Sequence, residues 1–333
     1  MTVSSNHLSS YSDDDHIENA DEVLQRIFGI DGNGSSMGSD MVNLSERARK
    51  LDSLEFKKPA ETRLIAVANQ KGGVGKTTTA VNVASALAEH GLSVLLIDMD
   101  PQGNASTAMG VDHSEGVRSV YDVLEGRLSL NEVKSSSEHF SNLDVVPASI
   151  DLSGAEMELA TLHERNNLLN SAIQALLADA PTQYDYVIVD CAPSLGLLVL
   201  NALCAVKEVL IPIQAEYYAL EGLGQLLHTI GLVQRSFNPK LIVSTMLITM
   251  YDKRTLLSKE VFDEIQRHYE GIVLNTTIPR SVKISEAPSF GQSIITYDPR
   301  GAGSVAYGEA AYELNSRSEK VIQKLHRQEG NEE

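Results

Sequence analysis

A glycine-rich loop between two apolar segments constrains this chain more than any other feature of its sequence. The stretch from Leu64 to Thr79 reads LIAVANQKGGVGKTTT. Its first five residues predict a buried strand, and the apolar spacing from Lys76 to about His90 predicts a helix. The order strand, glycine loop, helix is typical of a loop that binds phosphate, so the sequence predicts an α/β fold that holds a nucleotide.

The residue types of this loop fit a polyphosphate. Its glycines can adopt backbone conformations that are closed to residues with a Cβ, which lets successive N–H groups converge on the phosphates. Lys76 is placed to reach the β- and γ-phosphates, and the Thr77 hydroxyl is placed to ligate Mg²⁺. The predicted phosphate-binding residues are Lys71, Gly72, Gly73, Val74, Gly75, Lys76, Thr77 and Thr78.

The loop departs from the usual pattern G-x-x-x-x-G-K-[ST] at its start. The pattern would place glycine at position 70, where this chain has Gln70, and a second lysine, Lys71, follows. Because Lys71 precedes the turn of the loop, its side chain need not reach its own phosphates. A cation at this position is free to approach a nucleotide held by a facing subunit.

Length allows one large or two ordinary domains, and the composition favours a cytosolic protein. The chain has 333 residues, of which 42% are hydrophobic, and this share is enough for a sizeable core. No apolar run approaches the roughly 20 residues that a membrane helix needs, and the first residues lack the pattern of a signal peptide. The two cysteines, Cys191 and Cys204, lack the spacing of a metal or redox site, which favours buried thiols.

The net charge of −18 is unevenly distributed. From Arg235 to the end there are 13 Lys and Arg and 13 Asp and Glu, so all of the net negative charge lies upstream. Net charge governs solubility, whereas a local basic patch governs contact with phosphate. The acidic balance therefore does not exclude nucleic acid as a partner.

The first sixty residues are rich in Ser, Asp, Asn and Gly and predict a largely disordered extension. Residues 61–333 then form the predicted nucleotide-binding domain. Two stretches of the extension have helical spacing, one from Ile17 to Phe28 and one from Leu44 to Leu54. They are either transient helices in solvent or segments that dock on a further partner.

Acidic residues follow two further apolar runs. Ser93–Asp98 predicts a second strand and leads into DMDPQGN, and Tyr184–Asp190 predicts a third strand that ends in an acid. Open α/β sheets place their ligands at this end of the strands. Asp98 and Asp100 are two apart and would point the same way in an extended segment. One could hold the metal's water shell and the other could orient or deprotonate a water, while Asp190 would hold Mg²⁺ through water.

Strands and helices alternate along the rest of the chain. A strand is predicted at 143–147 among short helices, and others at 209–213, 241–248 and 272–278, with helices between them and a closing helix from about Ser304 to Leu325. This alternation predicts a doubly wound, mostly parallel sheet with helices on both faces.

The motifs taken together resemble the ParA/Soj family of chromosome-partitioning ATPases. They are KGGVGKTT, DMDPQGN, VIVDCAPS, EYYALEGL and PRSVKISEAPS, and the resemblance covers about residues 63 to 325. It implies a P-loop NTPase with a deviant Walker A loop that binds ATP and Mg²⁺. It also implies that Lys71 contacts the partner subunit's nucleotide, that subunits meet at Gly72, that Asp100 is needed for hydrolysis and that Asp190 is the Walker B acid. The adenine pocket is then expected near Met250, Pro279 and Arg280.

The resemblance also implies partners. Two subunits would sandwich two ATP molecules, and this dimer would bind DNA without sequence preference through Arg254 and Lys283, with Lys253, Lys259 and Arg280 as weaker candidates. Lys283 is commonly arginine in relatives, so it keeps the charge but loses the bidentate fork. A ParB-type protein would stimulate hydrolysis and so release the dimer from the nucleoid, and the cargo would be a chromosome or a plasmid.

Three other classes of protein remain open at this point. A MinD-like ATPase binds membrane through a C-terminal amphipathic helix, but the apolar face here is only Val321, Ile322 and Leu325. A cluster-carrying ATPase needs cysteines that ligate iron between subunits, and these two are not suitably placed. A structural protein without hydrolysis would not need the retained lysine, threonine and acidic residues.

Overall fold

The computed structural model describes residues 37–162, 164–179, 183–216 and 219–329. The chain divides into two compact units, Met1–Arg47 and Ala48–Glu333. Helix α2 (Met37–Asp52) begins in the first unit and ends in the second. The strands and the other helices that the structure describes belong to the second unit.

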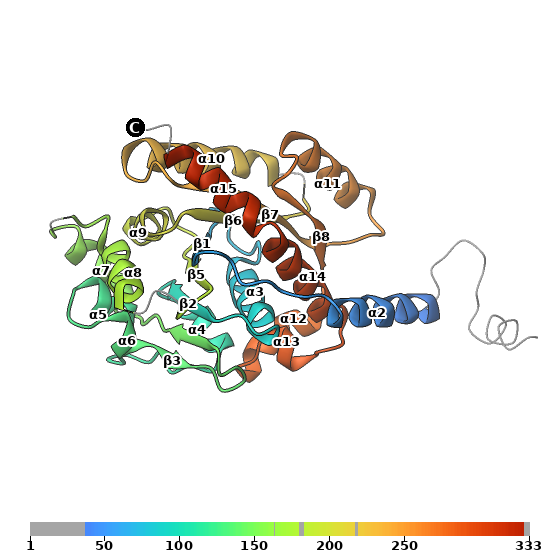
Figure 1. Cartoon of the computed structure of the whole chain (residues 1–333), viewed down its shortest axis with the longest axis horizontal. Helices are drawn as coiled ribbons and strands as arrows, with labels where there is room; N and C mark the ends of the chain where they lie inside the picture. The colour runs from blue at the N-terminus through green and yellow to red at the C-terminus, as the bar shows by residue number, and fades with distance from the viewer. Residues whose placement is uncertain (1–36, 163, 180–182, 217–218, 330–333) are drawn as a thin grey trace, which may run out of the picture. The chain divides into compact units, whose positions relative to one another are not determined.

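The second unit is built on one eight-stranded sheet (Figure 1). Its strands are β1 (Arg63–Val67), β2 (Val94–Met99), β3 (Ser135–Ser136), β4 (Leu143–Val146), β5 (Tyr186–Cys191), β6 (Glu208–Gln214), β7 (Ile242–Tyr251) and β8 (Val273–Pro279). Their order is β3-β4-β2-β5-β1-β6-β7-β8, and only the short β3 is antiparallel to its neighbour. The predicted mostly parallel sheet is confirmed, with strand ends shifted by at most three residues.

Helices cover both faces of the sheet because successive side chains of each buried strand point to opposite sides. In β1, Leu64 and Ala66 belong to one apolar cluster, and Ile65 and Val67 belong to the other. Helices α8 (Leu168–Asp179), α9 (Leu197–Ala205) and α10 (Ala219–Ser236) contribute to the first cluster. Helices α3 (Lys76–Glu89) and α14 (Ala302–Ser316), which lie side by side in Figure 1, contribute to the second. The doubly wound architecture follows directly.

The other described helices either lie between two strands in the sequence or follow β8, the last strand. They are α4 (Asn104–Ala108), α5 (Val120–Leu124), α6 (Leu130–Val133), α7 (Leu152–Leu159), α11 (Leu256–His268), α12 (Val282–Glu286), the 3-10 helix η1 (Ala287–Phe290), α13 (Ile294–Tyr297) and α15 (Ser318–Glu329). The closing helix predicted from Ser304 to Leu325 is therefore two helices, α14 and α15, which are separated at Arg317.

The N-terminal extension is ordered beyond residue 36. The helical stretch predicted from Leu44 to Leu54 lies in α2, where Ala48 and Leu51 are buried. The stretch from Ile17 to Phe28 lies outside the described residues. Residues 37–52 form α2, and within the second unit Ala48 and Leu51 are buried, whereas Met41 and Val42 are exposed.

A buried ion pair joins β1 to β6, and its arginine also bonds to α14 and α15. The Arg63 guanidinium donates two hydrogen bonds to Glu208, at 2.6 and 2.8 Å, and others to the Leu314 carbonyl and the Ser318 hydroxyl. Burial alone would lower the pKa of Arg63, but the Glu208 carboxylate outweighs it and the pKa is raised. Both side chains are 1% exposed, so each charge depends on the other.

Replacing Glu208 with alanine should reduce the free energy of unfolding by about 3–5 kcal/mol, because it leaves a buried guanidinium without its counter-charge. Urea unfolding of the purified protein measures this loss. The matched control is Glu61→Ala, which removes the partly exposed pair of Glu61 with Lys207 and should cost no more than about 1 kcal/mol. Equal losses in the two variants would contradict the structural role of the buried pair.

Candidate nucleotide site

The glycine loop lies between the end of β1 and the start of α3, as predicted. Gly73 and Gly75 have φ angles of 74° and 88°, which residues with a Cβ rarely adopt. A Cβ at Gly72 or Gly73 would meet no atom within 4 Å, so the space beside these glycines is open. The Thr249 hydroxyl donates to the Val74 carbonyl at 2.8 Å and fixes the middle of the loop from β7.

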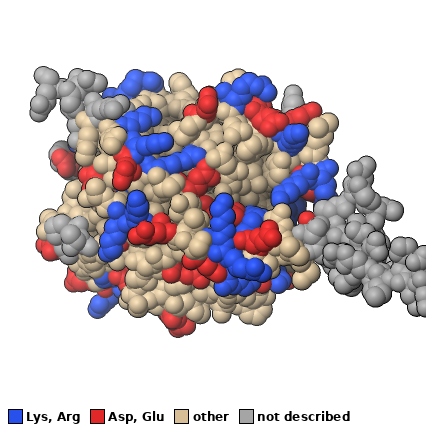
Figure 2. Space-filling model, turned by 45° about the vertical axis from the view of Figure 1, so that its right-hand side comes forward, with Lys and Arg blue, Asp and Glu red and all other residues tan. Residues whose placement is uncertain are grey.

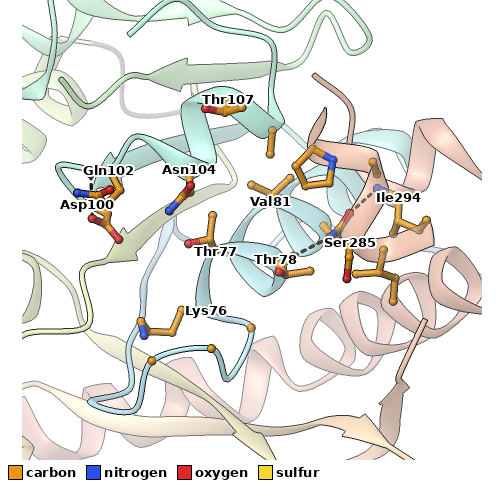
Figure 3. A pocket seen from close by; sticks show the side chains of 18 of the residues that line it. Lys76, Thr77, Thr78, Val81, Asp100, Gln102, Asn104, Thr107, Ser285 and Ile294 are labelled. Atoms are coloured by element: carbon orange, nitrogen blue, oxygen red, sulfur yellow. Dashed lines mark hydrogen bonds between the residues drawn. The ribbon is translucent and has the colours of Figure 1, made fainter. Parts of the chain in front are cut away.

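A cavity of about 510 Å³ opens over this loop. Figure 3 shows the side chains of Lys76, Thr77 and Asp100 around it, with the first two coming from the start of α3 and Asp100 from the loop after β2. Gln102, Asn104, Thr107 and Ser285 also line it. The size and the lining suit a nucleoside triphosphate.

Lys76 and Lys71 are oriented differently. The Lys76 ammonium donates to the Lys71 carbonyl at 3.1 Å, inside the loop. Burial lowers the pKa of Lys76, while the charges of Asp190 and Asp100 oppose that change. The Lys71 ammonium instead lies 3.0 Å from the Glu216 carboxylate, and Lys71 is not among the residues that line the cavity. Lys71 therefore points away from the phosphate cradle of its own chain, as its place before the turn predicts.

Asp190 has the environment of a metal-site carboxylate. It lies at the end of β5, opposite Asp98 in the pairing of β2 with β5, and both are fully buried. Within the part of the chain that the structure describes, neither Asp190 oxygen has a hydrogen-bond partner within 3.5 Å, and the nearby Thr77 hydroxyl acts to lower its pKa. Burial, and next the charge of Asp98, raises the pKa of Asp190. Burying a charged carboxylate costs free energy unless a cation or an ordered water binds its oxygens. The residues present therefore fit Mg²⁺.

Asp98 and Asp100 do not share the orientation that their spacing predicts. Strand β2 ends at Met99, and the chain then turns, so the period of two does not extend to Asp100. Asp100 lines the cavity, whereas the Asp98 carboxylate accepts hydrogen bonds from the Asp100 N–H and from the N–H and hydroxyl of Ser106. Burial raises the pKa of Asp98 to about 6, although these hydrogen bonds act to lower it. Asp98 thus holds the loop that carries Asp100, and its role as a metal ligand stays a prediction.

The three residues predicted around the adenine base lie together. A second cavity of about 210 Å³ is lined by Met250, Pro279 and Arg280, and it shares Gly75, Thr78 and Met250 with the first. Met250 has a φ of 53°, a strained conformation for a residue with a long side chain. Strain of this kind is typical of a ligand site, and the arrangement fits a base next to the phosphate loop.

The sequence did not single out several residues that shape this site. Thr249 fixes the loop, and Asn69 ties it to β6 by donating to the Pro212 carbonyl at 2.8 Å. Asn69 lies in the loop stretch and the cavity-lining Asn104 lies in the DMDPQGN motif, so a sequence motif pointed to both residues. No motif pointed to Thr249, because its role depends on β7 lying beside the loop.

The two predicted DNA contacts follow neighbouring strands. Arg254 comes after β7 and Lys283 after β8, so both lie near the same edge of the sheet. Arg254 is 89% exposed and forms a two-point ion pair with Asp252. Lys283 pairs with Asp298 at 2.9 Å. Both cations are accessible, and each is partly neutralised by a carboxylate of its own chain.

The apolar face of α15 and both cysteines are largely covered by the rest of the domain. On α15, Ile322 and Leu325 are buried against the domain, which removes most of the apolar face of that helix. No helix in the described part of the chain is long and apolar enough to cross a membrane. Cys191 and Cys204 are both buried, and burial raises the pKa of both thiols.

Comparison with known proteins gives consistent matches. Residues 62–243 match the model of a family described as an AAA domain. The sporulation initiation inhibitor protein Soj of Bacillus subtilis is 47% identical over 252 residues, which are 76% of this chain and 98% of that protein. The chromosome partitioning protein ParA of Caulobacter vibrioides is 47% identical over 255 residues, which are 77% of this chain and 94% of that protein.

Solved structures with the same fold contain nucleotides. A cobyrinic acid a,c-diamide synthase from Mycobacterium smegmatis, with bound ATP analog and magnesium, is 39% identical and superposes with a TM-score of 0.64 over 75% of this chain and 93% of that one. A putative plasmid partition protein from Borrelia burgdorferi, bound to AMPPNP, is 25% identical with a TM-score of 0.59 over 72% of this chain and 97% of that one.

Proposed function

The chain belongs to the ParA/Soj family of chromosome-partitioning ATPases, and on that premise we propose that it is an ATP-switched dimer that holds DNA until hydrolysis releases it. The observation that carries this proposal is the site itself. An open glycine cradle and the cavity-lining Asp100 lie around one space large enough for ATP, and the buried Asp190 carboxylate interacts with Thr77 and Lys76, which line the same space. The mycobacterial synthase carries the name of a different enzyme, but both partitioning relatives are more similar to this chain.

Each residue has a distinct task in the proposed hydrolysis. The loop N–H groups and Lys76 bind the phosphates, and Thr77 and Asp190 would hold Mg²⁺ directly and through water. Bound Mg²⁺ would neutralise charge that develops on the phosphates. Asp100 orients the attacking water or accepts its proton, and Asp98 keeps the Asp100 loop in place. Met250, Pro279 and Arg280 contact the base.

The nucleotide would act as the switch because it supplies negative charge at the face between subunits. Lys71 of each subunit would approach the triphosphate bound by the other, which stabilises the pair of subunits. Loss of the γ-phosphate weakens that attraction, and the subunits separate. A dimer presents twice the basic surface of one subunit, so its affinity for DNA is much higher.

The proposed cell-level function follows from this cycle. The ATP-bound dimer binds the nucleoid without sequence preference, and a ParB-type protein on the replicated origin of a chromosome or plasmid stimulates hydrolysis. Repeated release and rebinding would move the origins apart. DNA retention compared with ATP, with ADP and without nucleotide tests the switch, and retention that is independent of nucleotide would contradict it.

Removing the charges of Arg254 and Lys283 should weaken DNA binding evenly across sequences. Each Arg or Lys that contacts a phosphate contributes about one unit to the salt slope of the affinity, so the double variant with glutamine should show a flatter salt dependence. Mobility shifts with two unrelated duplexes in ATP measure both effects. A matched control replaces Lys320 and Lys324, which are exposed on α15, with glutamine. Unchanged retention in the first variant would refute the assignment.

A membrane-bound ATPase of the MinD type is the rival function. The burial of Ile322 and Leu325 disfavours it, because a membrane anchor needs a broad apolar face that is free to enter the lipid. Sedimentation with anionic liposomes and with DNA, each in the presence of ATP, separates the two functions. Recovery with liposomes but not with DNA would favour the rival.

A further inference from the structure

Residues 48–62 form a strap that runs from the last turn of α2 to β1. The Leu51 side chain packs against Gly308 on α14, where a Cβ would lie only 2.4 Å from Leu51 Cδ2. The Asn315 side chain donates to the Lys57 carbonyl and accepts from the Lys57 N–H. The strap is therefore fixed to α14 by an apolar contact and by hydrogen bonds.

Aromatic stacking holds the second half of the strap. Phe56 stacks on His90 with ring centroids 4.0 Å apart and meets the edge of Tyr312 at 5.4 Å. His90 caps α3 and Tyr312 belongs to α14, so the strap bridges the two helices. The matched AAA domain begins at residue 62. The strap thus precedes the matched segment and packs both on His90 within it and on α14 beyond it.

The strap brings a carboxylate to the surface that carries Lys283. Asp52 pairs with Arg300 at 2.7 Å. Arg300 lies two residues after Asp298, whose carboxylate pairs with Lys283. The turn that joins them is tight, because a Cβ at Gly301 would lie 1.9 Å from the Asp298 carboxylate. Arg300 and Lys283 therefore lie beside one short turn, and each is paired with an acid.

The surface charges are consistent with this interleaved arrangement. Figure 2 shows Lys and Arg next to Asp and Glu on the face in view, without one continuous basic area. Asp52 and Arg300 are 53% and 68% exposed. An exposed ion pair contributes only about 0–1 kcal/mol, so an incoming phosphate can displace the carboxylate.

We propose that the strap is an internal brake on DNA binding, in which Asp52 competes with DNA phosphate for Arg300 beside Lys283. The inference rests on the proposed function, since it adds Arg300 and its competitor to the same DNA surface. Release of the strap from α14 would free Arg300 from Asp52 and strengthen binding.

The test measures DNA affinity of the full chain with ATP at several salt concentrations. Asp52→Asn should bind DNA about three- to ten-fold more tightly as a dimer, with a salt slope larger by about one unit per subunit. The matched control is Glu55→Gln, which removes the same charge from the next exposed carboxylate of the strap and should change little. Arg300→Gln should weaken binding. The double variant Arg300→Gln with Asp52→Asn should bind DNA no more tightly than Arg300→Gln alone. Leu51→Ala, which loosens the strap, should tighten binding as well.

The outcomes separate this inference from the function on which it rests. If Arg254 and Lys283 matter but Asp52→Asn behaves like Glu55→Gln, the DNA function stands and the brake is refuted. If Asp52→Asn also tightens binding in the Arg300→Gln background, Arg300 is not the group that it masks and the inference fails. If no variant changes DNA retention, both the DNA surface and the brake are refuted.

Discussion

Lys71→Ala should leave nucleotide binding largely in place but remove the ATP-dependent dimer. Lys76, not Lys71, lines the cavity over the glycine loop, so the phosphates keep their own lysine. In the single subunit the Lys71 ammonium forms an ion pair with Glu216 of its own chain. Because the Lys71 side chain is 36% exposed, it can exchange this partner for another. In the dimer it would meet a triphosphate, whose charge exceeds that of one carboxylate. Losing a charge pair of this kind should weaken dimerisation by more than about 30-fold.

Size-exclusion chromatography with light scattering, with and without ATP, measures this change. Lys58→Ala is the matched control, because Lys58 is an exposed lysine on the strap with a side chain that is 69% exposed. Lys76→Ala gives the contrasting defect and should lose nucleotide binding itself. A Lys71→Ala protein that still forms dimers in ATP would contradict the proposed contact between subunits. A crystal structure of the ATP form with Lys71 on its own nucleotide would contradict it as well.

Local sequence patterns predicted the sheet and the phosphate loop because both depend on short-range constraints. A continuous apolar run has to be buried on two faces, which is the condition of a central parallel strand. The glycines at 73 and 75 occupy positions with positive φ, so their residue type reports the backbone directly. For the same reason Lys76 and Thr77 could be placed at the start of α3 before the structure was known.

The different environments of Asp98 and Asp100 depended on contacts that are distant along the chain. Asp98 accepts from Ser106, eight residues later, and only the packing of α4 against β2 brings the two together. Spacing along an extended strand could not predict where β2 ends. The environment of Asp190 likewise depends on Asp98, its neighbour in the strand pairing. The sequence thus identified the acids of the site but not their separate orientations.

The two ends of the chain were the least predictable for the same physical reason. Composition described residues 1–60 as polar, yet Leu51 and Phe56 pack on α14 and on His90, far away in the sequence. The closing helix divides at Arg317, which donates to the Val273 carbonyl on β8 and to Glu313. Neither contact leaves a periodic signal in the sequence. Both ends are defined by partners on other elements.

Asp100→Ala should bind ATP and DNA but hydrolyse ATP about 10²- to 10⁴-fold more slowly, which is the usual contribution of a general base. Asp100 is the acid of the DMDPQGN motif that lines the cavity with Lys76 and Thr77, and it is 7% exposed. Its carboxylate accepts a hydrogen bond from the Gln102 N–H at 3.0 Å, within its own loop. Removing the carboxylate should therefore leave the glycine loop, Thr77 and Asp190 in place. Nucleotide binding and dimerisation should then persist while release from DNA is slowed.

Phosphate release, measured beside nucleotide affinity and DNA retention, separates this outcome from a folding defect. Asp100→Asn is the matched variant, because the amide oxygen can still accept from Gln102 while the base is lost. It should hydrolyse as slowly as Asp100→Ala. Normal phosphate release in either variant would mean that another group orients or deprotonates the attacking water. The buried Asp98 would be the next candidate. Slow hydrolysis combined with lost ATP binding would instead show that Asp100 supports the cavity rather than the chemistry. Only slow hydrolysis with intact ATP and DNA binding makes Asp100 the group through which ATP turnover releases DNA.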